Sequence, residues 1–153
     1  MNPAIFLTLD DTLITTLSKQ KYALHREDWK FINNSVEFIR EYYSKDYLIF
    51  IITNQSAIAN NITPEKVFHA KMELILTTLE KDLKIKPNYI QYRYCIDEES
   101  YSYLPQPGLI LDLALEYEVD LSKSILLGNS LYDKAILLYS GIRFYQDITD
   151  LIY

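Results

Sequence analysis

The chain has 153 residues, of which 49% are hydrophobic and 24% are charged, and its net charge is −6. This length and composition predict a globular protein with a single domain over residues 1–153. The acidic balance argues against nucleic acid or an anionic membrane as the partner. No apolar run is long enough to cross a bilayer, and one cysteine, Cys95, excludes an internal disulfide. Together these features predict a cytoplasmic protein without a membrane partner.

The first expected element is a buried strand over residues 4–9, where five of the six residues are apolar. The chain then turns polar at Asp10, Asp11 and Thr12. A continuous apolar run that ends in carboxylates is typical of a central parallel strand, whose carboxyl end faces the ligand. The alternative is a strand that ends in an ordinary polar turn, so the other segments of the chain must decide.

Residues 15–28 are polar and without clear periodicity, so we expect a loop, or flap, over the end of the first strand. The later elements expected in chain order are a helix capped by Ser35 that runs to residue 43, a strand over 47–52, a helix that starts at Thr63-Pro64, a strand over 89–95, a helix over 109–117, a strand over 124–127, a helix over 131–139 that ends at Gly141, and a strand over 142–145. This alternation predicts an α/β fold, a three-layer doubly wound parallel sheet with right-handed crossovers.

Polar residues or turns lie at or beyond the carboxyl ends of four of the expected strands. They are Thr8 and Asp10, Thr53-Asn54-Gln55, the turn at 105–108, and Asn129 with Asp133. Because the carboxyl ends of parallel strands lie along one edge of the sheet, we expect these residues to share one crevice.

Five segments in the same order match the motifs of one enzyme family. They are Leu9-Asp-Asp-Thr-Leu13, Asp28-Trp-Lys-Phe31, Thr53-Asn-Gln-Ser-Ala-Ile58, Pro105-Gln-Pro-Gly108 and Leu127-Gly-Asn-Ser-Leu-Tyr-Asp133. On these segments the chain resembles the haloacid dehalogenase (HAD) superfamily of phosphatases without a large cap domain. Within it, the chain is similar to the histidinol-phosphate and heptose-bisphosphate phosphatases and to the phosphatase domain of polynucleotide kinases.

The resemblance implies a nucleophilic aspartate at the end of the first strand and an acid/base aspartate two residues later. It also implies a hydroxyl and a lysine that hold the phosphoryl group, and acidic magnesium ligands after the fourth strand. Carried onto this chain, Asp10 falls at the acid/base position and Thr53 at the phosphate-binding hydroxyl. Asp133 falls at the later acidic position. Further ligand-binding candidates beside these are Asp11, Asn54, Gln55 and Ser56.

The chain departs from the family at three of these positions. Thr8 stands at the nucleophile, Leu104 at the lysine and Asn129 at the first metal-binding aspartate. A phosphothreonine is a stable ester, so turnover would stall even if Asp10 activated Thr8. Leu104 removes the charge that offsets a phosphoryl group. A magnesium site formed by Asp10, Asn129 and Asp133 would be weakened, because carboxylates that a hard cation prefers are missing.

A shifted register is the alternative, in which Asp10 attacks phosphorus. It would make Thr12 the acid/base group, and we disfavour it. The zinc loop of some heptose phosphatases is also not expected, because Asp97, Ser100 and Ser102 stand beside Cys95 where that loop has cysteine and histidine. We interpret Cys95 as a buried apolar residue, and His25 and His69 as solvated.

The sequence therefore favours a phosphatase fold that has lost catalysis and binds a phosphorylated small molecule or a protein partner. Two alternatives stay open. The first is an active magnesium-dependent phosphomonoesterase that acts on sugar or nucleic-acid phosphates through Asp10 and Asp133. The second is a structural or assembly subunit whose crevice has no function.

Overall fold

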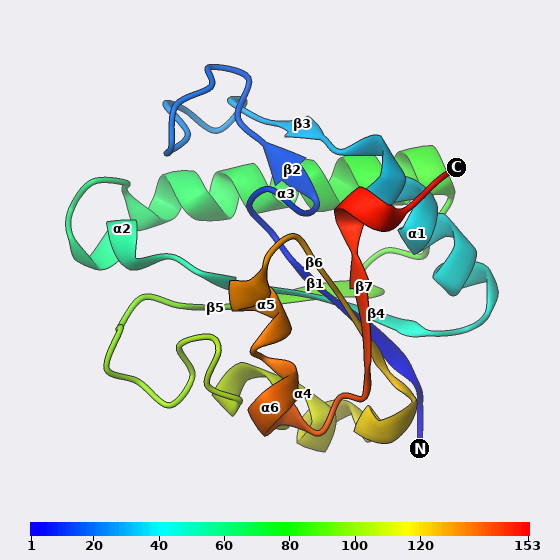
Figure 1. Cartoon of the computed structure of the whole chain (residues 1–153). Coiled ribbons are helices and arrows are strands. Elements are labelled where there is room, and N and C mark those ends of the chain that lie inside the picture. The colour runs from blue at the N-terminus through cyan, green and yellow to red at the C-terminus, as the bar shows by residue number, and fades with distance from the viewer.

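The computed structural model describes all residues from Met1 to Tyr153. Its centre is a five-stranded sheet in the order β5-β4-β1-β6-β7 (Figure 1). The strands are β1 (Ala4–Thr8), β4 (Leu48–Asn54), β5 (Ile90–Cys95), β6 (Ile125–Gly128) and β7 (Phe144–Asp147). All neighbouring strands run parallel. The predicted doubly wound parallel sheet is confirmed.

Helices cover both faces of the sheet (Figure 1). One face carries α1 (Asn33–Ser44) and α3 (Glu65–Leu83), and the other carries α4 (Gly108–Tyr117) and α6 (Leu137–Ser140). Four further short elements are α2 (Ser56–Ala59), α5 (Leu131–Lys134) and the 3-10 turns η1 (Leu121–Lys123) and η2 (Ile148–Asp150). The three-layer arrangement is the one that the sequence predicts. No helix combines the length and the apolar character needed to span a membrane.

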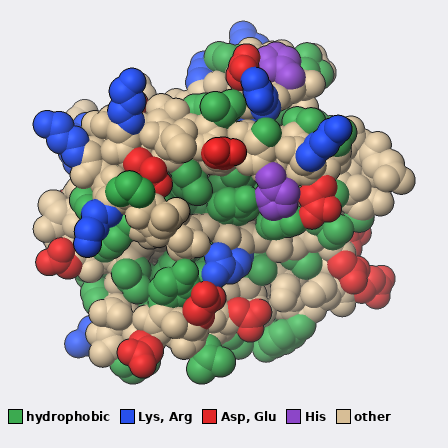
Figure 2. Space-filling model, turned by 180° about the vertical axis from the view of Figure 1, so that it is seen from behind, with side chains coloured by type: hydrophobic (Ala, Val, Ile, Leu, Met, Phe, Trp, Pro, Cys, Tyr) green, Lys and Arg blue, Asp and Glu red, His purple; other side chains and the backbone are tan.

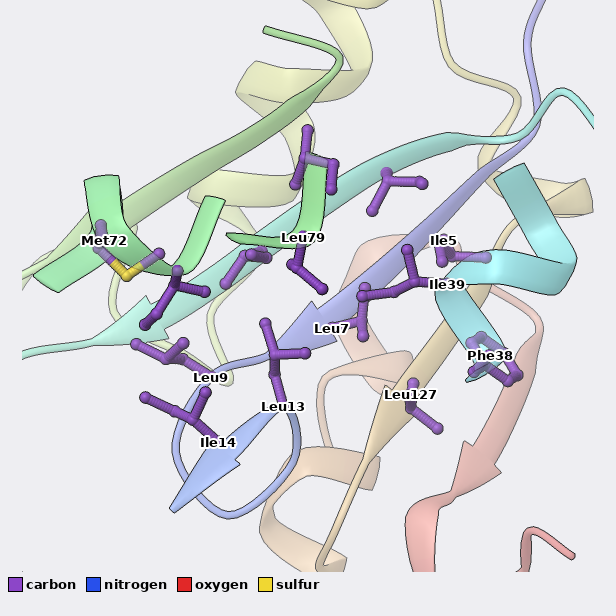
Figure 3. Close-up of a cluster of buried hydrophobic side chains, with 14 of the residues drawn as sticks. Ile5, Leu7, Leu9, Leu13, Ile14, Phe38, Ile39, Met72, Leu79 and Leu127 are labelled. Atoms are coloured by element: carbon purple, nitrogen blue, oxygen red, sulfur yellow. The ribbon is translucent and has the colours of Figure 1, made fainter. Parts of the chain in front are cut away.

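Strand β1 is buried along its whole length and serves two hydrophobic cores. Ile5 and Leu7 pack into the core beneath α1 and α3, which Figure 3 shows, whereas Ala4 and Phe6 pack into the core beneath α4. This alternation follows from strand geometry, in which successive side chains point to opposite faces. Burial on both faces is the reason that the segment reads as an almost unbroken apolar run.

The predicted flap is built on a small two-stranded ribbon. Strands β2 (Ile14–Thr15) and β3 (Lys30–Phe31) pair antiparallel, and the loop between them is residues 16–29. Asp28 is 2% exposed and folds this loop around its carboxylate, which accepts hydrogen bonds from Ser18 N at 2.8 Å, Ser18 Oγ at 2.6 Å and Leu24 N at 2.9 Å. The Ser18 hydroxyl and these main-chain N–H groups lower the pKa of Asp28 to about 2.

Some predicted element boundaries are wrong. Ser35 does not cap α1, which begins two residues earlier. Its buried hydroxyl instead donates to the Thr12 carbonyl at 2.5 Å. The helix predicted over 131–139 is two short helices, α5 and α6, and the fully buried Ile136 lies between them. The last strand lies two residues later than predicted. Gly141 ends α6 with φ +86°, as expected.

Candidate active site

A cavity of about 140 Å³ lies at the carboxyl ends of β1 and β4. After β1 the chain forms β4 on one side and later returns to form β6 on the other, so the end of β1 is a switch point of the sheet. The cavity is lined by all four predicted catalytic positions, Thr8, Asp10, Thr53 and Leu104, and by Asp133, which was predicted as a metal ligand. We call this cavity the crevice.

The Thr8 hydroxyl is held on two sides. It donates to Oδ2 of Asp133 at 2.8 Å, and Thr12 Oγ1 lies 2.6 Å from it. Because a hydroxyl carries one hydrogen, the Thr12 hydroxyl must be the donor to Thr8. The Thr8 proton therefore points toward Asp133 and not toward Asp10. Any base that removed this proton would be Asp133.

Asp10 lies at the mouth of the crevice, where part of the residue is open to solvent while protein atoms surround its carboxyl group. Its Oδ2 accepts a hydrogen bond from Gln55 Nε2 at 3.2 Å, and the same amide donates to Thr53 Oγ1 at 2.9 Å. The protein packed around Asp10 raises its pKa by desolvation, whereas the Lys71 charge and the Gln55 hydrogen bond act in the opposite direction. Asp10 thus keeps its proton to a higher pH than an ordinary aspartate. This property suits a general acid.

Asp133 approaches β6 closely because residue 128 is glycine. A Cβ on Gly128 would lie 2.7 Å from the Asp133 Cβ, which is closer than real contacts allow. The Ser130 side chain caps α5 by accepting from Asp133 N, and Asp133 Oδ2 accepts from Asn129 N at 3.1 Å. Burial raises the pKa of Asp133, although the bonds from Thr8 and Asn129 N partly offset this effect.

The position that the resemblance assigns to a lysine is closed by apolar packing. Leu104 is 2% exposed and belongs to the core beneath α4. Asn54, predicted as a ligand-binding residue, binds the main chain of Leu104 instead, with one bond from Nδ2 to the carbonyl and one to Oδ1 from the amide, both 2.8 Å. The Tyr132 hydroxyl donates to the same carbonyl at 2.7 Å. Asn54 and Tyr132 thus hold the main chain at Leu104 in place.

The other predicted residues lie around the crevice. Gln55 is buried and bridges Thr53 and Asp10, whereas Ser56 begins α2 and its side chain makes no hydrogen bond. Asp11 points away from the crevice and lines a second cavity beneath the flap. It has φ +60°, a conformation that aspartate tolerates better than most residues.

The residues at the positions that the resemblance assigns to a zinc loop have other contacts. Cys95 is buried, as predicted, and its thiol lies 3.5 Å from the Asp97 carbonyl. Ser102 packs against Gly108 so closely that a Cβ there would lie 2.6 Å from the Ser102 Oγ. His25 is exposed, as predicted. His69 is half-buried, with ring nitrogens 2.6 Å from the Tyr92 hydroxyl and 2.9 Å from the Tyr94 hydroxyl.

Comparison with known proteins decides the family. A family model described as polynucleotide kinase 3 phosphatase matches residues 4–132. The chain belongs to this family of HAD phosphatases. It is 32% identical over 132 residues to the D-glycero-alpha-D-manno-heptose-1,7-bisphosphate 7-phosphatase of Campylobacter jejuni, which covers 85% of this chain and 73% of that protein.

Two further relatives agree with this assignment to the HAD phosphatases. The D-glycero-beta-D-manno-heptose-1,7-bisphosphate 7-phosphatase of Rhodopseudomonas palustris is 28% identical over 151 residues, which cover 92% of this chain and 80% of that protein. A crystal structure of the D,D-heptose 1,7-bisphosphate phosphatase from B. bronchiseptica, complexed with magnesium and phosphate, superposes with a TM-score of 0.74. It is 21% identical to this chain and covers 92% of it and 77% of the relative. That likeness confirms the HAD-type fold.

Several oxygen atoms of this HAD protein that could bind magnesium take part in hydrogen bonds instead. Hydrogen bonds from Thr8 and Asn129 N occupy the Oδ2 of Asp133, and the Asn129 side chain donates to the Asp10 carbonyl at 3.2 Å. The Asn129 amide nitrogen is not a magnesium ligand and covers a carbonyl oxygen that could be one, whereas the Oδ1 of the same side chain is an oxygen that magnesium could bind. Two carboxylates, Asp10 and Asp133, remain as ligands of the kind that this cation prefers.

Sequence reasoning missed Lys71 of α3. It is 7% exposed, and its ammonium group lies 5.7 Å from the centre of the Phe68 ring. No ion pair includes it, yet it is the charge that most lowers the pKa of Asp10. The signal was present in the sequence, because Lys71 follows Phe68 by three residues on the apolar stripe of the helix. A lysine at such a position has either an apolar neighbour for its stem or a charge to compensate.

Proposed function

We propose that this HAD-type protein binds phosphomonoesters of small hydroxylated molecules in the crevice and does not turn them over through an aspartyl phosphate. The relatives named above act on heptose bisphosphates, which supports a sugar-like ligand. The observation that carries the loss of turnover is Thr8 at the end of β1, with its hydroxyl bonded to Asp133 and Thr12. A phosphorylated threonine would be an ester with no built-in route to hydrolysis.

The surroundings of Thr8 support the same proposal. The apolar Leu104 supplies no charge to offset a transferring phosphoryl group, and such charges are usually a large part of catalysis. The Asn129 amide covers the Asp10 carbonyl, so the magnesium site is weakened. Asp10 and Thr53 remain at the crevice, joined through Gln55, and can hydrogen-bond a phosphate that carries a proton.

A second candidate is a phosphomonoesterase with an unusual site. The names of the relatives favour it, because they are phosphatases. The raised pKa of Asp10 favours it as well, since a protonated carboxyl could give its proton to the leaving alcohol. In this candidate Asp133 would accept the Thr8 proton or activate water.

Phosphate release and ligand binding separate the candidates. The purified chain is incubated with magnesium and a panel of sugar monophosphates and bisphosphates, and the same compounds are titrated by calorimetry. We expect binding without phosphate release. Release that Asp10→Asn abolishes and Asp97→Asn, an exposed control, leaves unchanged would establish the phosphatase instead. If the chain binds none of these compounds and releases no phosphate, the structural or assembly subunit is the remaining alternative.

A gain-of-function variant tests the assignment of the missing groups. Thr8→Asp, Leu104→Lys and Asn129→Asp together restore the nucleophile, the cation and a metal-binding carboxylate that the resemblance assigns to these positions. We expect magnesium-dependent phosphate release from this triple variant and none from the wild type. The double variant without Thr8→Asp is the control, and equal release from both would contradict the role of position 8.

A further inference from the structure

Two further cavities adjoin the crevice at the flap. The first, of about 560 Å³, lies beneath the flap, and no hydrophobic residue lines it. The second, of about 330 Å³, lies between residues 20–24 of the flap and residues 62–63, which precede α3. The crevice and the first cavity share Asp10, and the two flap cavities share Gln20 and Lys21. We call the first the flap cavity and the second the flap-tip groove.

The flap-tip groove differs from the flap cavity in its apolar lining. Four of its seven lining residues are hydrophobic, namely Tyr22, Ala23, Leu24 and Ile62. Leu24 is 68% exposed and Ile62 is 54% exposed, so each wall presents a large aliphatic side chain to solvent. Single exposed apolar side chains are ordinary, and on the back face of the molecule they lie among charged side chains of both signs (Figure 2). Exposed apolar side chains on both walls of one groove indicate a binding surface.

The main chain holds both walls of the flap-tip groove in place. On the flap, Leu24 N donates to the Asp28 carboxylate at 2.9 Å. On the other wall, Ile62 N and Thr63 N donate to the carbonyl of the buried Ala57 at 2.9 and 3.2 Å. The side chains of Leu24 and Ile62 therefore start from an ordered main chain. A groove that is already formed loses little conformational freedom when a ligand binds.

The shape of the lining favours an aliphatic group over a planar one. The Lys21 ammonium group lies 5.3 Å from the centre of the Tyr22 ring and covers one face of it. Ala23, Leu24 and Ile62 have aliphatic side chains and offer no flat face on which an aromatic ring could stack.

The order of the three cavities gives the order of chemical groups along a ligand. The crevice, at about 140 Å³, has room for one small group, whereas sites for whole small molecules commonly have roughly 300–1,000 Å³. A ligand whose phosphate enters the crevice therefore extends into the flap cavity, where polar residues suit hydroxyl groups. From there the next cavity is the flap-tip groove, which suits an apolar end.

We propose that the flap-tip groove is an apolar subsite that binds an aliphatic substituent of the ligand whose phosphate occupies the crevice. The ligand class is a phosphorylated sugar or polyol that carries an alkyl or acyl chain. This inference rests on the proposed function, because the crevice must bind the phosphate.

Calorimetric titration tests the subsite with two matched probes, the methyl and the hexyl glycoside of one hexose monophosphate. The probes have the same charge and the same hydroxyl groups and differ only in the length of the alkyl chain. The test variant is Leu24→Ser with Ile62→Ser. The matched control is Leu115→Ser with Leu138→Ser, which removes two exposed leucines from α4 and α6.

We expect the wild type to bind the hexyl glycoside about tenfold more tightly than the methyl glycoside, because burial of two methylene groups is enough for this difference. The test variant should bind the two probes equally, whereas the control variant should keep the preference. Both variants should bind the methyl glycoside as the wild type does, because its short chain does not reach the groove.

The possible contrary results are distinguishable. Equal affinity of the wild type for both probes, or a preference that the test variant keeps, overturns the subsite and leaves the proposed function intact. A nucleoside monophosphate that binds as tightly as the hexyl glycoside overturns the assignment of an aliphatic ligand. If the wild type binds none of these compounds, both the subsite and the proposed function are overturned.

Discussion

The pKa of Asp10, at the mouth of the crevice, depends on its burial and on the charge of Lys71. Desolvation raises the pKa of Asp10, and Lys71 is the charge that most opposes this rise. The carboxyl binds its proton more tightly in the folded than in the unfolded chain. Its contribution to stability is therefore fully present below the unfolded pKa, about 3.9, and declines as the pH rises through the folded value.

Lys71→Met should raise the pKa of Asp10 further, because the variant removes the opposing charge and keeps an apolar stem over Phe68. The pKa can be measured by NMR titration of the Asp10 carboxyl carbon. Lys66→Met, at an exposed position of the same helix, is the control and should leave that titration unchanged. An unchanged Asp10 titration in Lys71→Met would show that Lys71 does not act on Asp10.

Thr8 lies at the centre of a small hydrogen-bond network in the crevice. Thr8 is 6% exposed, its hydroxyl is hydrogen-bonded on both sides, and the hydroxyl proton points to Asp133. An aspartate in its place would stand next to the Asp133 carboxylate, and the two charges would repel one another without a cation between them. Thr8 and Asp133 instead share a hydrogen bond, which needs no cation.

At the scale of elements, the flap depends on a single buried carboxylate. Asp28 accepts bonds from both sides of the loop, and these lower its pKa to about 2 from an ordinary value of 3.8. A lowered folded pKa means that the stabilisation is fully present above the unfolded pKa and is lost as the pH falls toward 2. The flap should therefore stay closed throughout the neutral range and open in strong acid.

Asp28→Asn should loosen the flap at neutral pH, because an amide cannot accept all the hydrogen bonds that the carboxylate accepts. We expect trypsin to cleave after Lys19 and Lys21 at least several-fold faster in this variant, measured by mass spectrometry over time. Glu27→Gln changes the neighbouring, exposed carboxylate and should cleave like the wild type. Equal cleavage of all three proteins would mean that Asp28 does not hold the loop.

At the scale of the whole molecule, the sheet joins two cores that must both form. The core beneath α4 contains a row of aromatic rings, in which Phe50 lies with its centroid 5.4 Å from that of Phe6 and 5.1 Å from that of Tyr117. Phe50 is 1% exposed and belongs to β4, a neighbour of β1. Loss of this ring therefore affects the strands that carry the crevice.

Phe50→Ala should lower the free energy of unfolding by about 3–5 kcal/mol, because it removes a buried ring and leaves a cavity. Urea unfolding followed by circular dichroism measures this change. Phe144→Ala removes the same side chain from a position that is 55% exposed, and its effect should be much smaller. Similar effects of the two substitutions would contradict the packing described for β4.

The sequence by itself determined the layers of this protein and the strand ends that form the crevice. The run over residues 4–9 and the alternation of helices and strands are local patterns, so burial and periodicity express them directly. The tertiary structure alone decided which side chains meet. Thr8 and Asp133 are 125 residues apart, and Ser35 bonds to Thr12 instead of capping its helix. The Asn54 bonds to Leu104 likewise join segments 50 residues apart, a contact that no local pattern contains.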